Sequence, residues 1–352
     1  MVTKIKIKEN IVLILLILCC LLVVTVLSAE IFSKYVACPT DLMKDDEDKH
    51  HLFDFKYFKL KDSINRNLSF EETVKQIEKY CSNDTQKLSL VAGWIYDNID
   101  FDLRKFYSGG IANDYKTVFS LKKGICGDYS NIFAAFCNKL NIVTEIIEGY
   151  VPEFDSDNKI YYETNHVWNV VKIGNNWYHC DLLGFSGYLE KKLNGEIRFV
   201  KKPNINNFMT QNISFLSEHI PADPIWQLLN YPIPLDTLIK YRSDSKVDST
   251  GLFVDYENEI NRYINLSYPQ KKLLYADNAN KFNKNNSDVI VIEYYNASVD
   301  LINSWNRDKQ KLILARKYLE KAKKHIRDAT DTVKILDDEI ERALALIRKY
   351  VP

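Results

Sequence analysis

The stretch Gly124-Ile-Cys-Gly-Asp-Tyr-Ser130 decides the fold of this chain, because it opens a segment with apolar residues at helical spacing. That spacing predicts a helix over residues 126–139. Cys126 then stands in the first turn, where free backbone N–H groups and the helix dipole favour the thiolate. Asp128 is expected to cap the same helix, and Gly124 permits a turn that a larger residue would resist. The sequence therefore predicts an activated thiol at a helix start.

Two motifs downstream supply an imidazole and a carboxylate. Asn165-His-Val-Trp-Asn-Val-Val171 predicts a strand over 166–173, and Trp177-Tyr-His-Cys-Asp-Leu-Leu-Gly184 predicts a second strand over 177–182. A two-residue turn at Gly174-Asn175, with glycine first, is typical of a type II′ hairpin. That turn pairs residue 173 with 176, so His166 and Asp181 project from one face as diagonal neighbours. A three-residue loop would place them on opposite faces.

These three side chains form a coherent set for thiolate chemistry. We predict that Cys126 attacks a carbonyl, that His166 relays its proton, and that Asp181 orients and supports the imidazolium. His179 shares the face of Asp181 and is a rival base. Trp168 shares the face of His166, where it lines either the cleft or the core. The oxyanion donors are expected to include the Cys126 backbone N–H, and the second donor is not identified.

The other cysteines carry less information. Four of the seven lie outside both the N-terminal apolar run and the proposed nucleophile, and the sequence does not choose among their three possible pairings. Free buried thiols explain them equally well, and Cys137 and Cys180 are assigned to the core because neither stands at a helix start. Because no CxxC pair or His/Cys group has zinc spacing, we predict no structural metal and no cofactor. The seven cysteines are Cys19, Cys20, Cys38, Cys81, Cys126, Cys137 and Cys180.

Composition limits the class of protein. The chain of 352 residues is 46% apolar and 27% charged, which is typical of a globular protein. Lysine plus arginine equals aspartate plus glutamate, 47 each. A dedicated nucleic-acid binder would carry a basic excess, so no nucleic-acid partner is predicted.

The N-terminal residues predict export. Three lysines in the first eight residues precede an uncharged apolar run, Ile11–Leu27. A basic segment before such a run is an export signal, and the run lies at the short edge of a membrane span. We favour an uncleaved single-pass anchor over residues 1–30, with cleavage after Ser28 and secretion as the alternative. Either way the folded part lies outside the cytoplasm, after a charged linker over residues 31–52.

The remaining chain predicts two domains, at residues 53–245 and 250–352. Ser69-Phe-Glu-Glu72 has the pattern of a capping box. Prolines after residue 220 forbid a long regular element there, so an extended wrap is expected to close the first domain near residue 245. Further helices are predicted at 70–80, 84–98, 252–264, 269–282 and 287–305, with a polar hairpin at 188–200.

The C-terminal helical domain ends in a predicted coiled-coil seam. Apolar residues from Leu312 to Ile347 alternate at spacings of three and four. This predicts one helix from Asp308 to Tyr350, roughly 60 Å long. Alanine at many seam positions allows close helix approach, so the seam is expected to pack on the preceding helices. A homodimeric coil is the alternative.

The three catalytic motifs resemble those of the transglutaminase-like superfamily, and Trp94-Ile-Tyr-Asp-Asn-Ile-Asp-Phe101 is also similar to that family. The likeness covers about residues 70–185. It implies a papain-like α+β fold, in which the cysteine helix packs on an antiparallel sheet that carries the histidine and the aspartate. The segment His219-Ile-Pro-Ala-Asp-Pro-Ile-Trp-Gln227 resembles extensions of bacterial members and of kyphoscoliosis-peptidase relatives. Leu182-Leu-Gly departs from the family pattern after the aspartate.

The resemblance implies acyl transfer at amide bonds of a protein or peptide substrate, by proteolysis, amidase action or glutamine–lysine cross-linking. These reactions share an acyl-enzyme and differ in whether water or an amine resolves it. Hydrolysis is the first choice, because no acceptor site can be identified in the sequence. The alternative is a non-catalytic scaffold for protein or cell-wall interaction, in which the helical domain is the working part.

Overall fold

The computed structural model describes residues 52–152, 163–211, 213–240, 254–306 and 308–351. The predicted anchor, most of the predicted linker and Cys19, Cys20 and Cys38 lie outside these residues. Within the described ranges, no helix combines the length and the apolar character that a membrane span requires.

A five-stranded antiparallel sheet in the order β8-β5-β4-β3-β9 is the centre of the fold. Ile173 lies opposite Asn176 across the predicted hairpin turn, which confirms the expected register. Gly174 in that turn has φ 59°, a left-handed conformation that glycine adopts without steric penalty. The strands are β3 (Thr144–Tyr150), β4 (His166–Ile173), β5 (Asn176–Cys180), β8 (Phe208–Thr210) and β9 (Ile220–Pro221).

The edge strands β8 and β9 come from the segment after Gly184. We expected only an extended wrap around the proline-rich part of that segment, yet β9 pairs with the end of β3. This is possible because the β9 pairing is two residues long, with Pro221 as its last residue. Both edges of the sheet are thus supplied by chain that follows the predicted site motifs.

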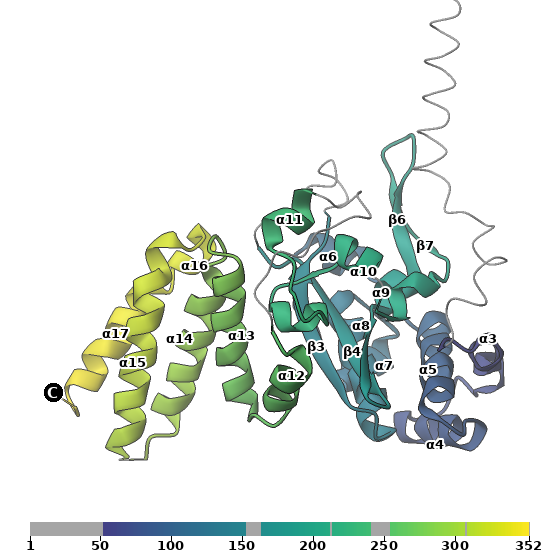
Figure 1. Cartoon of the computed structure of the whole chain (residues 1–352), viewed down its shortest axis with the longest axis horizontal. Helices are drawn as coiled ribbons and strands as arrows, with labels where there is room; N and C mark the ends of the chain where they lie inside the picture. The colour runs from purple at the N-terminus through teal and green to yellow at the C-terminus, as the bar shows by residue number, and fades with distance from the viewer. Residues whose placement is uncertain (1–51, 153–162, 212, 241–253, 307, 352) are drawn as a thin grey trace, which may run out of the picture. The chain divides into compact units, whose positions relative to one another are not determined.

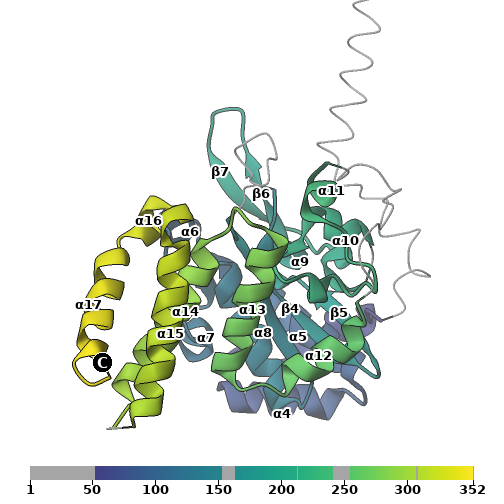
Figure 2. The ribbon, with the colours of Figure 1, turned by 60° about the vertical axis from the view of Figure 1, so that its left-hand side comes forward.

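Helix α8 (Cys126–Lys139), which has the predicted bounds, covers one face of the sheet (Figure 1). Its side chains Ile132, Phe133 and Phe136 are fully buried in a core shared with α5 (Asp84–Asn98). The opposite face carries a second core of Trp168, Trp177 and Trp226 and of residues from α12 (Tyr256–Ile264). Figure 2 shows α12 on this side of the sheet. The fold is α+β, with the sheet between α8 and α12.

Shorter elements surround this centre. The Ser69–Glu72 capping box is confirmed, because Ser69 N donates to Glu72 at 2.9 Å and Glu72 N donates to Ser69 Oγ at 3.3 Å. The shorter elements around the sheet are α3 (Phe55–Lys59), η1 (Leu60–Ser63), α4 (Phe70–Tyr80), β1 (Asp100–Phe101), α6 (Leu103–Tyr107), α7 (Tyr115–Leu121), β2 (Lys123–Gly124), α9 (Leu182–Ser186), β6 (Gly187–Lys191), β7 (Ile197–Lys201), η2 (Ile205–Asn207), α10 (Ile213–Glu218), η3 (Pro224–Gln227) and α11 (Leu235–Lys240).

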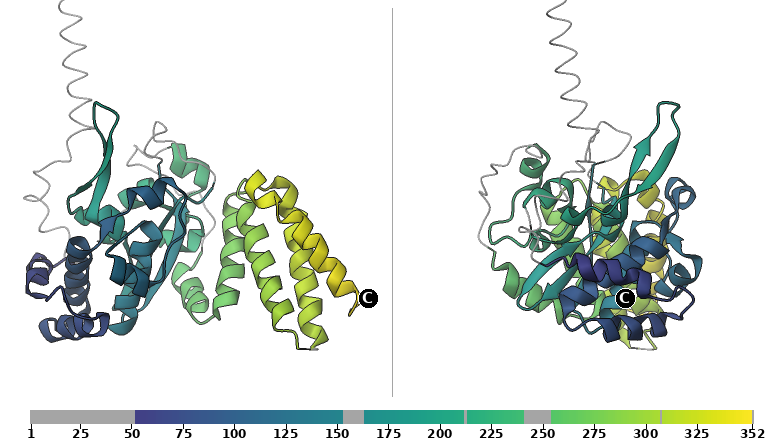
Figure 3. Two further views of the ribbon diagram at one scale, coloured as in Figure 1. Left: turned by 180° about the vertical axis from the view of Figure 1, so that it is seen from behind. Right: turned by 90° about the vertical axis from the view of Figure 1, so that its right-hand side faces the viewer.

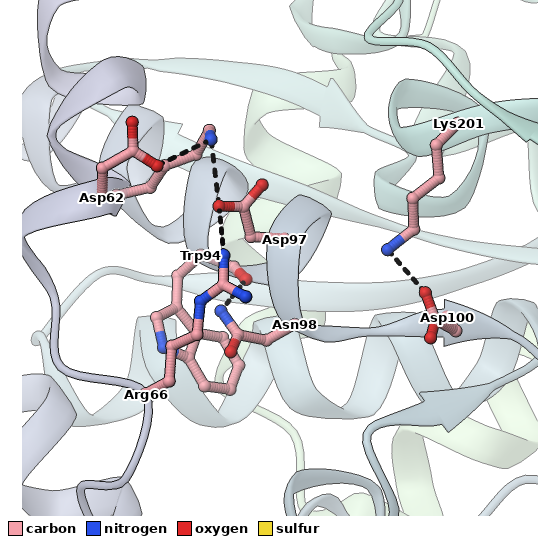
Figure 4. Close-up of polar contacts among 8 residues, drawn as sticks. Asp62, Arg66, Trp94, Asp97, Asn98, Asp100 and Lys201 are labelled. Atoms are coloured by element: carbon pink, nitrogen blue, oxygen red, sulfur yellow. Dashed lines mark hydrogen bonds and ion pairs between the residues drawn. The ribbon is translucent and has the colours of Figure 1, made fainter.

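Charged side chains attach two outer segments to this centre (Figure 4). Lys61 Nζ lies 2.9 Å from Asp97 of α5, and Arg66 lies 3.3 Å from the same carboxylate. Lys201 of β7 lies 2.6 Å from Asp100 of β1. Ion pairs near the surface contribute about 0–1 kcal/mol each to the free energy of unfolding. These contacts therefore fix the positions of the two outer segments more than they stabilise the fold.

The C-terminal region is helical, and its helices α13, α14, α15 and α17 lie side by side (Figures 1 and 3). The three helices predicted between residues 252 and 305 are confirmed within four residues at each end. The elements after α12 are α13 (Tyr268–Phe282), α14 (Asp288–Asn303), α15 (Lys309–His325), η4 (Ile326–Asp328), α16 (Asp331–Lys334) and α17 (Asp337–Arg348).

The prediction of one unbroken helix from Asp308 to Tyr350 is wrong. The chain leaves the α-helix after His325 and turns back, so that α17 packs on α15. Thr330 ends the turn in an extended conformation, and its N–H and hydroxyl both donate to Asp288, at 2.7 and 2.6 Å. Seam residues such as Leu319 and Ala322 are fully buried within the chain, as expected for packing on neighbouring helices.

Polar contacts join the helical region to strand β3. Lys272 and the hydroxyl of Tyr275 lie 3.0 and 3.1 Å from Glu148. The hydroxyl of Tyr150 accepts hydrogen bonds of 3.2 Å from the side-chain amides of two asparagines, Asn283 and Asn286. The predicted boundary between residues 245 and 250 lies outside the described residues.

Candidate active site

Asp128 organises the start of α8. Its carboxylate accepts the Ile125 N–H at 2.8 Å, which is the cap expected from the sequence. It also accepts the Asn113 N–H at 2.6 Å and lies 2.7 Å from Lys105 Nζ. Because Asp128 is fully buried, the three contacts together compensate its charge and hold the chain between Lys105 and Asn113 against the helix start.

Cys126 is the first residue of α8, and its partly buried thiol lies close enough to His166, the first residue of β4, for the imidazole to lower the pKa of the thiol. The alternation of side chains places His166 on the sheet face of Trp168. Helix α8 packs on the other face, against Val171 and Cys180. The contact is made at the end of the sheet, where the imidazole on the first residue of β4 reaches the helix start.

Asp181 completes the chain of contacts. Its Oδ2 lies 2.9 Å from His166 Nε2, and because a carboxylate is only an acceptor, the imidazole donates. This leaves His166 Nδ1 as the ring nitrogen for the thiol. Asp181 follows β5 and caps α9, where its Oδ1 accepts the Leu183 N–H at 3.0 Å. The structure thus brings together the three residues to which the sequence assigned catalytic roles.

The electrostatics of the three groups favour a thiolate–imidazolium pair. Burial opposes the charge on Cys126, but the hydrogen bond and positive charge of His166 outweigh it and lower the pKa of the thiol. Burial also opposes the charge on His166, yet Asp181 and Cys126 raise its pKa to about 10. Burial disfavours the Asp181 carboxylate, but His166 and His219 hold its pKa well below the usual range.

The fourth group at this site is His219, which the sequence analysis did not assign to it. Its Nε2 lies 3.0 Å from Asp181 Oδ2, the same oxygen that accepts from His166. His219 is buried and precedes β9 directly. No local pattern indicates this contact, because 38 residues separate His219 from Asp181.

The two other candidates near the site are buried in the second core. His179 Nδ1 accepts the Trp168 Nε1–H at 3.1 Å. Burial, with a smaller effect of His219, lowers the pKa of His179 to about 3, so this ring is a neutral imidazole at neutral pH and binds a further proton only weakly. Trp168 is fully buried and stacks on His166 at a ring distance of 5.9 Å. His179 is therefore a poor rival base, and Trp168 supports the site from the core.

Comparison with known proteins finds a family match for part of the chain. Residues 71–182 match the family model described as the transglutaminase-like superfamily. These residues form a transglutaminase-like domain. Kyphoscoliosis peptidase of Mus musculus is 23% identical over 164 residues, and that of Homo sapiens is 22% identical over 165 residues. Each match covers 46% of this chain and 24% of the relative, so the chain spans about a quarter of the length of these relatives.

Two solved structures are similar to parts of the chain. A protein of Cytophaga hutchinsonii described as a cysteine-protease candidate is 22% identical, covers 43% of this chain and 44% of its own, and has a TM-score of 0.27. A crystal structure of a TGase is 16% identical, covers 48% of this chain and 41% of its own, and has a TM-score of 0.28.

Two residues of the transglutaminase-like domain and one residue after it form a set of side chains with the chemistry of metal ligands. His166, Asp181 and His219 place their donor atoms within 4.8 Å of one another. Both imidazoles already contact one carboxylate oxygen, at 2.9 and 3.0 Å. A metal ion would have to displace the Nε2 hydrogens that the two imidazoles donate to Asp181. We therefore interpret the set as a hydrogen-bonded network.

Proposed function

We propose that the transglutaminase-like domain is a cysteine-dependent acyl-transfer enzyme that acts on amide bonds of a protein or peptide, with hydrolysis as its main reaction. The observation that carries this proposal is the 2.9 Å hydrogen bond from His166 to the buried Asp181, beside a Cys126 thiol whose pKa His166 lowers. A helix start, an imidazole and a buried carboxylate in this order are the parts that thiolate catalysis needs.

The reaction would proceed in two steps. Cys126 Sγ attacks the amide carbonyl, and the developing oxyanion is stabilised by the Cys126 backbone N–H. His166 donates its proton to the leaving amine, the C–N bond breaks, and a thioester remains on Cys126. Water then attacks the thioester, with His166 as the base, and the acid product leaves. An amine in place of water would give transamidation.

Selective alkylation tests the thiolate–imidazolium pair. At pH 7 we expect iodoacetamide to modify Cys126 before the other cysteines, and His166→Ala to abolish that preference. Cys81 is a reference thiol within the same chain, because burial raises its pKa to about 11. Cys126 labelling that is no faster than that of Cys81, or that is unaffected by His166→Ala, would contradict the proposal and favour a non-catalytic scaffold.

A second assay identifies the acyl acceptor. Casein and a peptide panel are incubated with the protein, with and without a fluorescent primary amine. Hydrolysis predicts new peptide termini without incorporated amine, whereas transamidation predicts fluorescent product. Cys126→Ala must abolish either signal.

We further propose that the domain is exported and held at a membrane by its N-terminal segment. The support is the sequence alone, in the lysines before the apolar run Ile11–Leu27. Extraction of membranes with alkaline carbonate tests anchoring, and protease digestion of intact cells tests the side on which the domain lies. Release of the full-length protein by carbonate would contradict anchoring.

A further inference from the structure

The carboxylate of Asp181 is shared by two imidazoles. His166 Nε2 and His219 Nε2 lie 2.9 and 3.0 Å from the same oxygen, Oδ2. Oδ1 accepts the Leu183 N–H at 3.0 Å. Three donors from three separate segments therefore surround one buried carboxylate, and one of them, His166, lowers the pKa of the thiol.

His219 is held in place independently of Asp181. Its ring stacks on Phe215 at 4.0 Å with an interplanar angle of 5°, and Trp168 meets it edge-on at 5.5 Å. The next residues form β9, which pairs with β3 through Ile220 and Tyr150. The ring is thus fixed by the aromatic core and by the sheet edge, which makes it a rigid donor.

The hydrogen bonds assign the tautomer of His219. Nε2 faces a carboxylate, which only accepts, so Nε2 carries the hydrogen. Nδ1 is buried and has no hydrogen-bond partner among the described residues. The titratable groups that face the ring are Asp181, His166 and, across Phe215, His179. A second hydrogen on Nδ1 would be a buried donor without an acceptor, beside the His166 imidazolium.

We propose that His219 is a positioning residue, whose Nε2–H holds the Asp181 carboxylate in the orientation that pairs it with His166. Without this donor the carboxylate turns about its side-chain bond, and His166 loses the fixed partner that keeps it an imidazolium against Cys126. His219 does not touch the thiol and acts only through Asp181. This inference rests on the proposed thiolate chemistry.

The test compares two replacements of His219 by the rate of Cys126 alkylation with iodoacetamide between pH 5 and pH 9. His219→Phe keeps an aromatic ring but removes the N–H donor. At pH 6 we expect the alkylation rate to fall about tenfold, because the loss of one charge-assisted hydrogen bond changes an equilibrium by about that factor. His219→Gln restores an N–H at a similar distance and should recover the rate to within about threefold. Tyr263→Phe is the matched control, because Tyr263 belongs to the same core and packs on Trp226, and its rate should match that of the wild type.

Two results would overturn the proposal. One is a wild-type rate in His219→Phe. The other is an equal loss in His219→Gln and His219→Phe at unchanged melting temperature, which would show that the ring only packs.

A measurement on the unmodified protein separates this inference from the proposed function. Long-range ¹⁵N NMR spectra, assigned with single histidine variants, report which ring nitrogen carries the hydrogen. We expect His219 with hydrogen on Nε2, and a change in that signal in Asp181→Asn. A hydrogen on Nδ1 alone would overturn the role of His219 even if Cys126 labels selectively. The Nε2 form together with non-selective labelling would refute the proposed function while supporting the Asp181–His219 hydrogen bond.

Discussion

Gly149 lies directly opposite His166 in the β3–β4 ladder, and no side chain fits at that position. A Cβ atom there would lie 2.3 Å from the Ile220 carbonyl oxygen and 2.4 Å from the Trp168 ring. The glycine therefore lets β9 and the tryptophan approach the strand that carries the imidazole. Its role is steric, since its φ angle is not in the left-handed region.

Replacing this glycine should damage both stability and the site. In Gly149→Ala, either β9 or the Trp168 ring must move, so we expect a loss of about 1–3 kcal/mol in the free energy of unfolding. Cys126 alkylation at pH 7 should also slow, because Trp168 supports the His166 ring. Urea unfolding and the labelling rate measure the two effects. An alanine variant as stable and as reactive as the wild type would contradict the close packing.

The carboxylate of Asp181 should set the pH range of the site. In the wild type the pKa of His166 is raised to about 10, so the imidazolium persists to alkaline pH. In Asp181→Asn the larger of the two charges that raise this pKa is lost, so the imidazolium should lose its proton at a lower pH. Asparagine still caps helices, so α9 should remain.

We expect Asp181→Asn to lower substrate turnover about 1,000- to 10,000-fold. The pH at which Cys126 becomes reactive should rise toward that of an ordinary thiol. Asp54→Asn is the matched control, because Asp54 also caps a short helix, α3. An unchanged pH profile in Asp181→Asn would refute the role of the carboxylate.

The buried ion pair at the start of α8 should stabilise the fold. Lys105→Met leaves the fully buried Asp128 with only its two backbone donors, so we expect a loss of about 2–4 kcal/mol in the free energy of unfolding. Lys87→Met is the control, since Lys87 pairs at 3.3 Å with Asp84, which is 44% exposed. That change should cost less than about 1 kcal/mol. Equal urea midpoints for the two variants would contradict the prediction.

Asp223 should make stability depend on pH. It is fully buried, accepts hydrogen bonds from Asn278 and from the Ile225 N–H, and burial raises its pKa to about 7. The folded pKa exceeds the unfolded value of about 3.9, so the protonated carboxyl of Asp223 contributes to the free energy of unfolding. This stabilisation is complete below pH 4 and is lost as the pH rises through 7.

Asp223→Asn removes that titration, and Asn278 can turn its amide over to keep the hydrogen bond. Relative to the wild type, the variant should gain stability between pH 4 and pH 8 by a few kcal/mol, about 4 at most. Urea unfolding at both pH values measures this. Asp300→Asn, an exposed change in α14, should show no such trend. A pH-independent difference for Asp223→Asn would contradict the raised pKa.

Local physics made much of this protein predictable from its sequence. Helices 84–98 and 126–139 and strand 166–173 have the predicted bounds, because apolar spacing and capping residues act over a few neighbouring positions. The Gly174-Asn175 turn determined the hairpin register, and with it the nearness of His166 and Asp181. The candidate nucleophile, base and acid were therefore identifiable as one set from local pattern and resemblance.

Only the tertiary structure decided the contacts between distant segments. Regular spacing predicted one C-terminal helix, but hydrogen bonds from Thr330 to Asp288, 42 residues away, accompany its break. His219 hydrogen-bonds Asp181 across 38 residues, and Cys126 and His166 stand at the starts of two separate elements, α8 and β4. Side-chain periodicity reports which face of an element is buried, but it carries no information on which distant donor a buried carboxylate or hydroxyl will meet. That choice depends on how the whole chain packs.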